Sequence, residues 1–468
     1  MALCRSRRAA HQADTMSPMP VVDAKSNALD PVADFVLRAR RPRTSHALTV
    51  VSLFSGGGLS DAGYLAAGFE IVVQAELEPK RAAIGAANFP KSKWIVGDVR
   101  KTAGEIVKAY REQTTKPLAL LVATPPCQGL SSSNPSRGKR ATDNAKKNAK
   151  KNALLLRIIQ VARKLKPRVI VAENVRQILT HEVYWNGAKR TVVDVLKREL
   201  PKYDFWHTTI DVADYGVPQS RIRAAIVGIL KTEKCVAALR EAEVAPIPAQ
   251  THCTGGGDGY KTWVTVRQWC EARQYPPLDA SCEAKATSAD PLHNVPWYDE
   301  ERYRLIADIP KHSGKSAYDN DTCPNCDKKA GTTPHANCPH CGKALWNRPI
   351  KRGKGRPRLI TGFLSSYRRM RSDRPAATIT TNSSHVGSDW KIHPFENRVF
   401  SARECGDLQT VPHWYSWAAA LEDRQRYLVR TLIGEALPPY FTYLHGRVLA
   451  YLLRTGKITA KRLLTPAD

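Results

Sequence analysis

The chain has 468 residues, with 72 Lys and Arg against 43 Asp and Glu, which gives a formal net charge of +29. Its 42% hydrophobic content excludes disorder throughout, and no run approaches the ~18 apolar residues that a membrane span requires. A charge excess of this size favours a polyanionic partner, most often nucleic acid. The alternative is a generally basic surface that aids solubility.

The first 46 residues have no hydrophobic periodicity, and we expect them to form a disordered basic tail. No apolar segment follows Arg5, Arg7 and Arg8, so a secretory signal is not expected, and Met16 is a second candidate start. The eleven cysteines are odd in number and mostly scattered. This pattern argues against a secreted disulfide framework and predicts a reducing, cytoplasmic location.

From residue 47 onward, strand-like and helix-like segments alternate. We expect strands at 48–54, 70–76, 118–124, 168–174 and 224–230, and helices from Ser60 and at 79–89, 153–166 and 191–200. Continuous apolar strands separated by amphipathic helices predict an α/β fold with a parallel sheet covered on both faces. Such sheets bind ligands beyond the carboxyl ends of their strands.

The alternation defines a catalytic domain at residues 47–252. Residues 253–395 are rich in Gly, Pro, Cys and basic side chains, which predicts a separate, smaller, loop-rich domain. Regular patterning returns near Arg398, and residues 444–454 have the pattern of an amphipathic helix. We therefore expect residues 396–468 to return to the catalytic domain.

A glycine-rich turn, FSGGG (54–58), follows the first strand and opens a helix. Glycines let the backbone approach a ligand closely, although many such turns are only tight turns. Glu76 ends the second strand, where a carboxylate can accept both hydroxyls of a ribose, and Asp98 could accept an adenine amino group. Together these residues suggest an adenosine-containing cofactor, and the spacing is not that of an ATP-hydrolysing phosphate loop.

Three further motifs lie at strand ends. In PPCQ (125–128), two prolines would hold Cys127 rigidly at the sheet edge as a candidate nucleophile, the alternative being a buried structural cysteine. Glu173, in ENV (173–175), could donate a proton or hold a substrate nitrogen, or merely cap a helix. Arg221 and Arg223 in QSRIR (219–223) alternate along one face and could bind a carbonyl or an acid, or form surface salt bridges.

Two Cys-x-x-Cys pairs in the smaller domain are separated by eleven residues. Cys323, Cys326, Cys338 and Cys341 have the spacing of a closed, tetrahedral, structural zinc site. Free thiols are the alternative. We expect His335 and His340 to be bystanders rather than ligands.

The motifs together resemble those of the DNA cytosine-5 methyltransferases. The resemblance runs in the family's order through FSGGG, the strand end at Glu76, GDV, PPCQ, ENV and DYGVPQSRIR (214–223), and then through RPAATITT (374–381), RVFSARECGDLQ (398–409) and GEALPP (434–439). Matching motifs in a fixed order are far more specific than any one of them. Two departures stand out: Glu435 replaces the family's usual Asn, which puts cofactor affinity in question, and LQTVPHWY (408–415) lacks the glycine usual after Leu-Gln.

The resemblance implies a Rossmann-like sheet that uses S-adenosylmethionine to methylate C5 of a flipped-out cytosine. Cys127 would attack C6, Glu173 would hold and protonate N3, Arg223 would bind O2, and Arg221 would support the loop or the Glu173 region. The cofactor-binding residues implied are Phe54, Ser55, Gly56, Gly58, Leu59, Glu76, Asp98, Pro125 and Glu435.

The resemblance also places the DNA-binding elements. Residues 137–151 carry seven Lys or Arg and one Asp where the family has a loop that closes over DNA, although charge runs are usually solvated faces. The expected DNA contacts are Gln128, Ser131, Arg137, Lys139, Arg140, Lys146, Lys147 and Gln219. Residues 253–395 match the family's target-recognition region.

Two other functions stay open at this stage: a look-alike that acts on RNA cytosine, and a catalytically silent DNA-binding regulator. For the leading interpretation we expect a monomer that binds double-stranded DNA, located at a bacterial nucleoid. It would act in a restriction-modification, orphan or phage context, and a cognate endonuclease would act on the same site.

Overall fold

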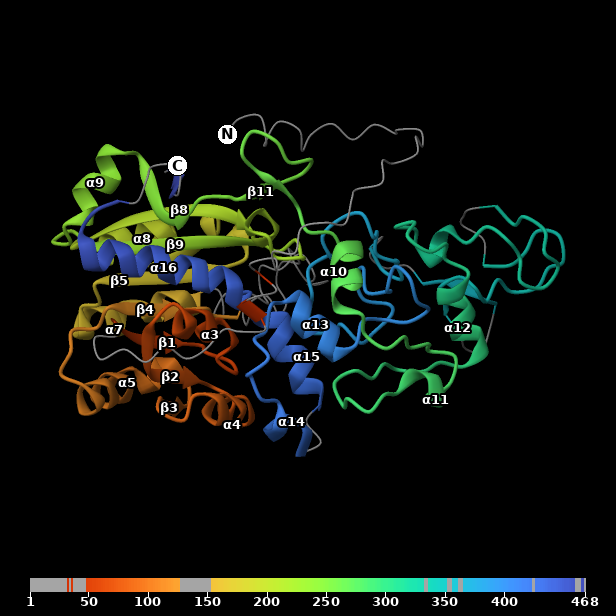
Figure 1. Cartoon of the computed structure of the whole chain (residues 1–468), viewed down its shortest axis with the longest axis horizontal. Helices are drawn as coiled ribbons and strands as arrows, with labels where there is room; N and C mark the ends of the chain where they lie inside the picture. The colour runs from red at the N-terminus through yellow and green to blue at the C-terminus, as the bar shows by residue number, and fades with distance from the viewer. Residues whose placement is uncertain are drawn as a thin grey trace.

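The computed structural model describes residues 32, 35–36, 48–126, 153–331, 336–351, 356–360, 365–422, 426–458 and 464–466. A seven-stranded sheet with strand order β3-β2-β1-β4-β5-β9-β8 forms the larger lobe (Figure 1). Its strands are β1 (Leu48–Leu53), β2 (Phe69–Glu76), β3 (Lys93–Val96), β4 (Leu120–Ala123), β5 (Val169–Asn174), β8 (Tyr203–Asp211) and β9 (Ile222–Leu230). All the expected strands are present.

Helices cover both faces of this sheet, as expected. On one face pack α5 (Val99–Gln113), α7 (Ile158–Leu165) and α8 (Val192–Glu199), and on the other lie α3 (Leu59–Ala66) and α16 (Pro439–Thr455). Further helices of this lobe are α4 (Pro79–Asn88), α9 (Cys235–Glu241), η1 (Ala153–Arg157), η2 (Arg176–Leu179) and η3 (Val212–Tyr215). Because both faces are buried, the central strands are apolar throughout rather than alternating. The α/β prediction is confirmed.

The direction of one strand differs from the expectation. β9 pairs antiparallel with both β5 and β8, whereas β3, β2, β1, β4 and β5 pair in parallel. The chain passes from β8 to β9 through the short η3 segment, without a covering helix. A parallel connection needs a crossover of a dozen or more residues, so this shorter link turns β9 back along β8.

The smaller lobe is built mainly from loops (Figure 1). Its elements are α10 (Val266–Arg273), α11 (Glu283–Ala286), α12 (Glu300–Ala307), η4 (Ala317–Asp319), β13 (Ile350–Lys351) and β14 (Arg358–Leu359). The short pair of β11 (His252–Cys253) and β12 (Lys261–Thr262) precedes them and contacts η3 of the larger lobe. It has an apolar cluster of its own, which includes Leu278, Ile306 and Ile392. Val266 and Trp269 instead join the main core of the larger lobe, so the two lobes share packed surface.

The C-terminal segment packs against the sheet. It contains α13 (Ala402–Leu408), α14 (Ala418–Glu422), α15 (Arg426–Glu435) and α16, and ends in β15 (Leu464–Pro466), which pairs with β10 (Val244–Pro248). A hairpin of β6 (Glu182–Trp185) and β7 (Ala188–Thr191) follows β5. No helix among the described residues is long and apolar enough to cross a membrane.

Three residues of the N-terminal segment depart from the expected disorder. Val32, Phe35 and Val36 are helical and buried in the main core. The Phe35 ring lies 5.5 Å from that of Tyr440 on α16, between centroids. The i, i+3, i+4 spacing of these three apolar residues provides one face that buries against α16, so the expectation of a disordered tail is wrong at these positions.

The crossing of α3 and α16 is close enough to require a glycine, and this can be tested. A β-carbon on Gly63 would lie 2.1 Å from the Pro439 carbonyl oxygen, a backbone atom that cannot move aside alone. We expect Gly63→Ala to destabilise the protein by about 3 kcal/mol or more in denaturant unfolding. Gly104 of α5 has open space around the same position, so Gly104→Ala should stabilise by about 0.5–1 kcal/mol. Equal stabilities of the two variants would contradict this packing.

Candidate functional site

The glycine-rich turn is fixed to the end of β2 by hydrogen bonds. The Gly56 amide donates to Glu76 Oε2 at 2.8 Å, and the Glu78 amide donates to Glu76 Oε1 at 3.0 Å. Gly56 and Gly58 have φ values of 55° and 78°, which favour glycine. Phe54 also has a positive φ of 60° without being glycine, which is a strained conformation. The glycine-rich turn and the side chain of Glu76 thus lie together at the edge of the sheet where the parallel strands end.

The start of α3 ties this turn to the C-terminal segment. Leu59 is buried, and Ser60 Oγ accepts from the Leu437 amide at 3.0 Å. The Ser55 amide donates to the Ala75 carbonyl at 3.0 Å. The turn predicted at residues 54–58 is therefore held by β2, and the helix that follows it is held by the GEALPP segment.

Asp98 has a structural role at the start of α5. It is the N-cap of α5, accepting from the Arg100 amide at 2.9 Å, and the Arg100 side chain also bonds to it. The hydrogen bond from the Arg100 side chain is the largest of the causes that lower the pKa of Asp98. Its carboxylate keeps a partly exposed position beside the strand end at Val96.

Two exposed apolar side chains next to these acids were missed by the sequence reasoning. Leu77 directly follows Glu76 and is 58% exposed, and Val96 pairs with Glu76 in the sheet and is 47% exposed. Exposed apolar side chains at the ligand-binding edge of such a sheet can cover a flat, uncharged ring. A single apolar residue after a strand carries no distinguishing signal in the sequence.

Glu173 and Arg223 form a buried ion pair at the end of β5. Arg223 Nε lies 3.0 Å from Glu173 Oε1, and both side chains are largely buried. Burial raises the pKa of Glu173, and the charges of Arg223 and Arg221 oppose that rise. A carboxyl group with a raised pKa holds its proton to a higher pH, as a proton donor must.

The strand that leads to PPCQ lies beside Glu173. β4 pairs with β5 in parallel, with Ala123 opposite Ala172, and Asn174 Nδ2 donates to the Pro125 carbonyl at 3.1 Å. Pro125 itself is buried. Outside the described residues lie Cys127 and the expected DNA contacts Gln128, Ser131, Arg137, Lys139, Arg140, Lys146 and Lys147.

Arg221 is buried between three segments rather than facing a ligand. Its guanidinium donates to the carbonyl oxygens of Ile379 at 3.0 Å, Gly434 at 2.8 Å and Glu435 at 3.0 Å. Only 1% of the residue is exposed. The two arginines of QSRIR thus have different roles: Arg223 pairs with Glu173, and Arg221 holds backbone carbonyl groups.

Gln219 is also internal. Its Nε2 donates to Gln409 Oε1 at 2.7 Å, and its Oε1 accepts from the Ile379 amide at 2.9 Å. The side chain is fully buried. The structure therefore places Gln219 inside the protein, at the junction of two motifs, rather than on a surface that DNA could reach.

Glu435, the departure from the family pattern, is paired with a cation. Arg81 of α4 lies 2.7 Å from its Oε2. Partial burial is the main cause that raises the pKa of Glu435, and the charge of Glu76 adds to the rise while Arg81 opposes it. The coupling to Glu76 places Glu435 near the glycine-rich turn.

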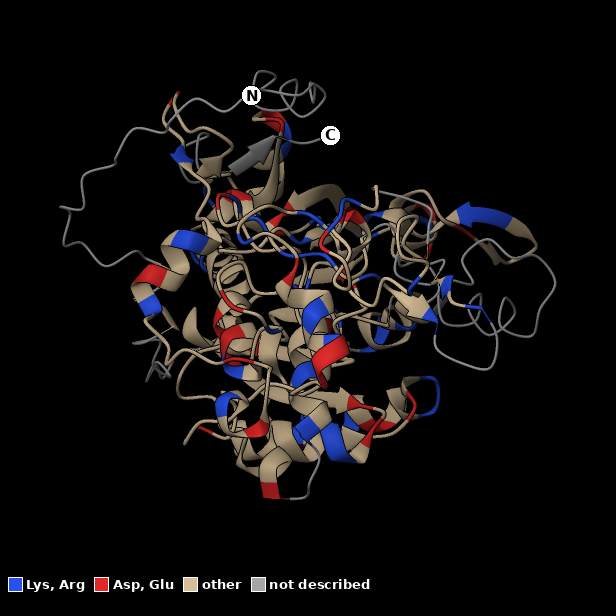
Figure 2. Cartoon of the chain, turned by 90° about the vertical axis from the view of Figure 1, so that its right-hand side faces the viewer, with Lys and Arg blue, Asp and Glu red and all other residues tan. Residues whose placement is uncertain are grey.

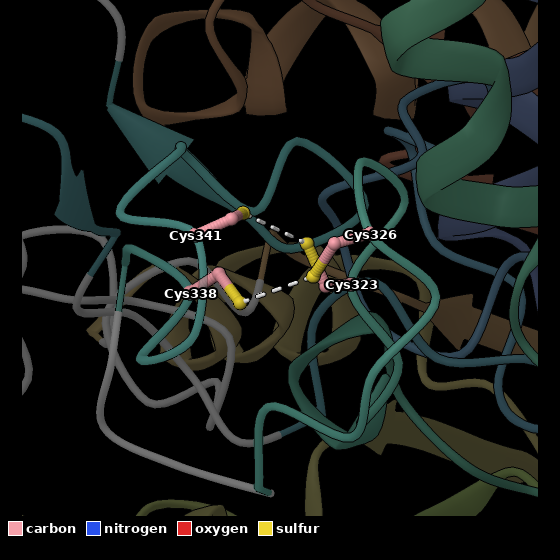
Figure 3. Close-up of side chains that lie close together, drawn as sticks. All are labelled: Cys323, Cys326, Cys338 and Cys341. Carbon is pink, nitrogen blue, oxygen red and sulfur yellow. Dashed lines mark hydrogen bonds between the residues drawn. The ribbon is translucent and has the colours of Figure 1, made fainter.

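The four cysteines of the smaller lobe converge (Figure 3). All four sulfur atoms lie within 4.8 Å of one another, with 3.8 Å between Cys323 and Cys341 and between Cys326 and Cys338. Thiolates about 2.3 Å from a tetrahedral zinc ion lie about 3.8 Å apart. His340 Nε2 bonds to the Lys329 carbonyl instead, at 3.0 Å, and His335 is outside the described residues.

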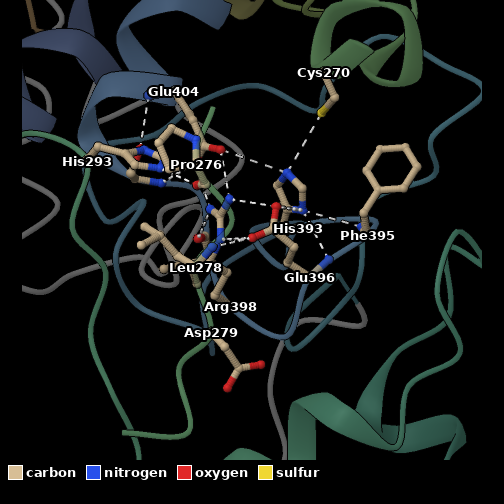
Figure 4. A network of polar contacts seen from close by, with 12 residues as sticks. Cys270, Pro276, Leu278, Asp279, His293, His393, Phe395, Glu396, Arg398 and Glu404 are labelled. Carbon is tan, nitrogen blue, oxygen red and sulfur yellow. Dashed lines mark hydrogen bonds and ion pairs between the residues drawn. The ribbon is translucent and has the colours of Figure 1, made fainter. Parts of the chain in front are cut away.

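A buried polar network joins the smaller lobe to the RVFSARECGDLQ segment (Figure 4). Arg398 bonds to both oxygens of Glu404, at 2.7 and 2.9 Å, and to Glu396. His393 Nδ1 accepts from the Glu396 amide at 3.1 Å, and burial lowers the pKa of His393 to about 3. Cys270 lies 3.8 Å from His393 Nε2, but burial raises the pKa of that thiol to about 12. His393 is therefore neutral and the Cys270 thiol protonated, so we assign this network a structural role.

Comparisons with known proteins place the whole site within one family. A family model described as C-5 cytosine-specific DNA methylase matches residues 48–446. The chain is 28% identical over 401 residues to the Type II methyltransferase M1.HgaI of Avibacterium volantium, covering 83% of this chain and 94% of that protein. It is 25% identical over 442 residues to the Type II methyltransferase M.XorII of Xanthomonas oryzae pv. oryzae, covering 89% and 88%.

One solved structure supports the fold. It is that of a candidate DNA modification methyltransferase encoded within a prophage of E. coli, with a TM-score of 0.51 and 19% sequence identity. The match covers 87% of this chain and 99% of that one. At this identity the likeness concerns the architecture alone.

The role of Arg221 as an internal connector can be tested by unfolding. Arg221→Met leaves three buried carbonyl groups without their donor, so we expect a loss of about 3 kcal/mol or more. Arg221→Lys keeps some of the hydrogen-bond donors, so its loss of unfolding free energy should be smaller. The control Arg358→Met removes an exposed arginine and should change stability by less than about 0.5 kcal/mol. A stable Arg221→Met protein would show that these bonds are dispensable.

Proposed function

Since this chain belongs to the C-5 cytosine-specific DNA methylase family, we propose that it transfers a methyl group from S-adenosylmethionine to C5 of cytosine in a specific duplex DNA sequence. The observation that carries this proposal is the family match over residues 48–446, because the proposed catalytic and cofactor residues all fall within it. The Type II names of the relatives support a role in restriction-modification.

The residues at the carboxyl edge fit the cofactor. Glu76 is buried, and each of its oxygens accepts one backbone amide, which leaves further acceptor capacity for the two hydroxyls of a ribose. Leu77 and Val96 would cover the adenine ring, and Asp98 would accept from its amino group. S-adenosylmethionine, when bound there, supplies an electrophilic methyl group. The ion pair with Arg81 compensates the extra charge of Glu435.

The catalytic steps follow from the chemistry of cytosine, whose C5 is a poor nucleophile. The thiolate of Cys127 would add to C6, which moves electron density to C5. Glu173, with its raised pKa, would protonate N3 and so prevent negative charge from building up on the ring. Arg223 would leave its ion pair partly to bind O2. After methyl transfer, loss of the C5 proton expels Cys127.

DNA recognition would be shared between several parts of the chain. A base inside a duplex cannot reach this edge of the sheet, so the target cytosine must be flipped out. Residues 128–151 would contact phosphates, and residues 253–395 would read the sequence. We propose a monomer acting at the nucleoid, with any cognate endonuclease recognising the same DNA site independently.

The cysteine cluster would hold one structural zinc ion. In each Cys-x-x-Cys turn a backbone amide faces the first sulfur, from Asn325 to Cys323 at 3.4 Å and from His340 to Cys338 at 3.3 Å. Such amides stabilise thiolate ligands. With four protein ligands, no position stays open for water, so the metal would order the smaller lobe rather than take part in the reaction.

The covalent step provides a direct test of the proposed function. DNA that contains 5-fluorocytosine at the target should trap a stable protein adduct, because fluorine at C5 cannot leave as a proton does. Cys127→Ser should abolish the adduct while keeping DNA binding. Cys282→Ser, which alters an exposed cysteine away from the site, should trap as the unchanged protein does.

The target is identified by a companion measurement. Bisulfite sequencing of DNA from expressing cells should show methylated cytosines in one sequence context. Methylation found only in RNA, or at cytosine N4 or adenine, would refute the proposal. Binding to DNA without any methylation would favour the silent regulator.

Zinc can be tested separately. We expect one zinc ion per chain in metal analysis, and Cys323→Ser and Cys341→Ser should lose it together with sequence-specific methylation. Binding of S-adenosylhomocysteine should persist in both variants, because the larger lobe has its own core. Cys282→Ser again serves as the control. Zinc-free protein with full specificity would overturn the assignment.

A further inference from the structure

A buried acid lies directly beneath the glycine-rich turn and takes no part in the steps above. Asp61 is the third residue of α3, and only 2% of it is exposed. Its Oδ1 accepts from Ser52 Oγ of β1 at 2.9 Å, and its Oδ2 accepts from Gln74 Nε2 of β2 at 2.8 Å. One carboxylate thus links the helix that follows the turn to both strands that flank it.

The side-chain amide of Gln74 lies against Gly58 and so connects Asp61 to the glycine-rich turn. A β-carbon on Gly58 would lie 2.9 Å from Gln74 Nε2, so the turn rests on this amide without room for a side chain. Gln74 is fully buried, and its Oε1 has no hydrogen-bond partner among the described residues. Only the carboxylate of Asp61 therefore fixes which end of the amide faces which way.

The turn is held from the opposite side by an uncharged contact. Tyr415 Oη donates to the Gly57 carbonyl at 2.6 Å. The Asp61 charge adds to the effect of burial in raising the pKa values of Tyr415 and of Tyr64. Both pKa values lie well above the usual range, so neither phenol titrates near neutrality.

We propose that Asp61 is a positioning residue for the cofactor: its ionised carboxylate orients Gln74 and Ser52, and thereby holds Gly56–Gly58 in the conformation that binds S-adenosylmethionine. This inference rests on the proposed function. An ionised carboxylate only accepts hydrogen bonds and selects the Nε2 end of Gln74. A protonated one can donate to Oε1, which lets the amide turn over beneath Gly58.

Protonation should therefore weaken cofactor binding in mildly acidic solution. Burial raises the pKa of Asp61 to about 6, against the hydrogen bonds from Ser52 and Gln74. The ionised form predominates above that pH and is lost as the pH falls through it. The other titratable groups facing this position are Tyr64 on α3 and Tyr415 from the segment after α13.

The experiment measures binding of S-adenosylhomocysteine by calorimetry between pH 5 and 8, without a turnover assay. We expect Asp61→Asn to weaken binding by about 10-fold at pH 7.5, as loss of a hydrogen bond to a charged group does. The affinity of the unchanged protein should fall below about pH 6, and that of Asp61→Asn should stay level. Amide hydrogen exchange at Gly56–Leu59 should become faster in the variant.

A rescue variant separates positioning from general structural damage. In Asp61→Asn combined with Gln74→Glu, the amide of residue 61 can donate to the new carboxylate, which restores the link with the charge moved by one residue. We expect this double variant to recover most of the affinity at pH 7.5, and thermal melting should show all proteins folded. Failure of the rescue in a folded protein would count against the proposal.

Failure of the Asp61 inference and failure of the proposed function give different results. If the unchanged protein binds S-adenosylhomocysteine and Asp61→Asn binds it equally well with the same pH dependence, the positioning role is refuted and the proposed function stands. If the unchanged protein does not bind it at all, the proposed function is refuted and this inference with it.

Discussion

The buried guanidinium of Arg221 is the contact on which the arrangement of the site depends. Arg221 directly precedes β9. Its guanidinium donates to carbonyl groups more than 150 residues further along the chain, in the RPAATITT and GEALPP segments. Burying an arginine costs free energy unless its N–H groups are hydrogen-bonded, so Arg221 stabilises the fold little when only one of the segments is in place. The three segments therefore come together as a unit. That unit sets α15, with Leu432, against the glycine-rich turn. Arg223, two residues further along the chain, faces Glu173.

The smaller lobe also contains buried arginines that donate to backbone carbonyl groups. Arg369 is fully buried and donates to the carbonyls of Ile306, Ile309, His393 and Glu396, and Arg348 donates to the Asn320 carbonyl. In a lobe with few long apolar runs, these buried arginines tie together backbone segments that a large core would otherwise hold. Part of the net charge of +29 is therefore internal. In Figure 2 the Lys and Arg positions are spread over many elements, with acidic positions among them.

The fold was predictable where local pattern decides the structure. The apolar runs identified five strands of the sheet, and the Cys-x-x-Cys spacing identified the converging cysteines. Two strands were not predicted: β3, because Lys93–Val96 is only four residues long, and β8, because YDFWHTTID (203–211) mixes polar and aromatic residues at the sheet edge. The antiparallel direction of β9 was not predicted either. Local pattern also could not separate Arg221 from Arg223, or show that Gln219 is internal. Those outcomes depend on partners that lie about 160 to 215 residues away in the chain.

Four acidic side chains lie near the carboxyl edge of the sheet, two of them paired with arginines, in a protein whose net charge is +29. Asp61, Glu76, Glu173 and Glu435 gather there: Glu76 contributes to the raised pKa of Glu435, and both Asp61 and Glu173 contribute to that of Tyr64. Burial disfavours the ionised form of Asp61, Glu173 and Glu435 and raises their pKa values, and the charge of Glu76 adds to the rise for Glu435. A positively charged ligand reverses that penalty, and the sulfonium of S-adenosylmethionine carries such a charge. On the proposed function, the basic exterior attracts the DNA polyanion while the acidic interior favours the cationic cofactor, so the two substrates are drawn to different parts of one site.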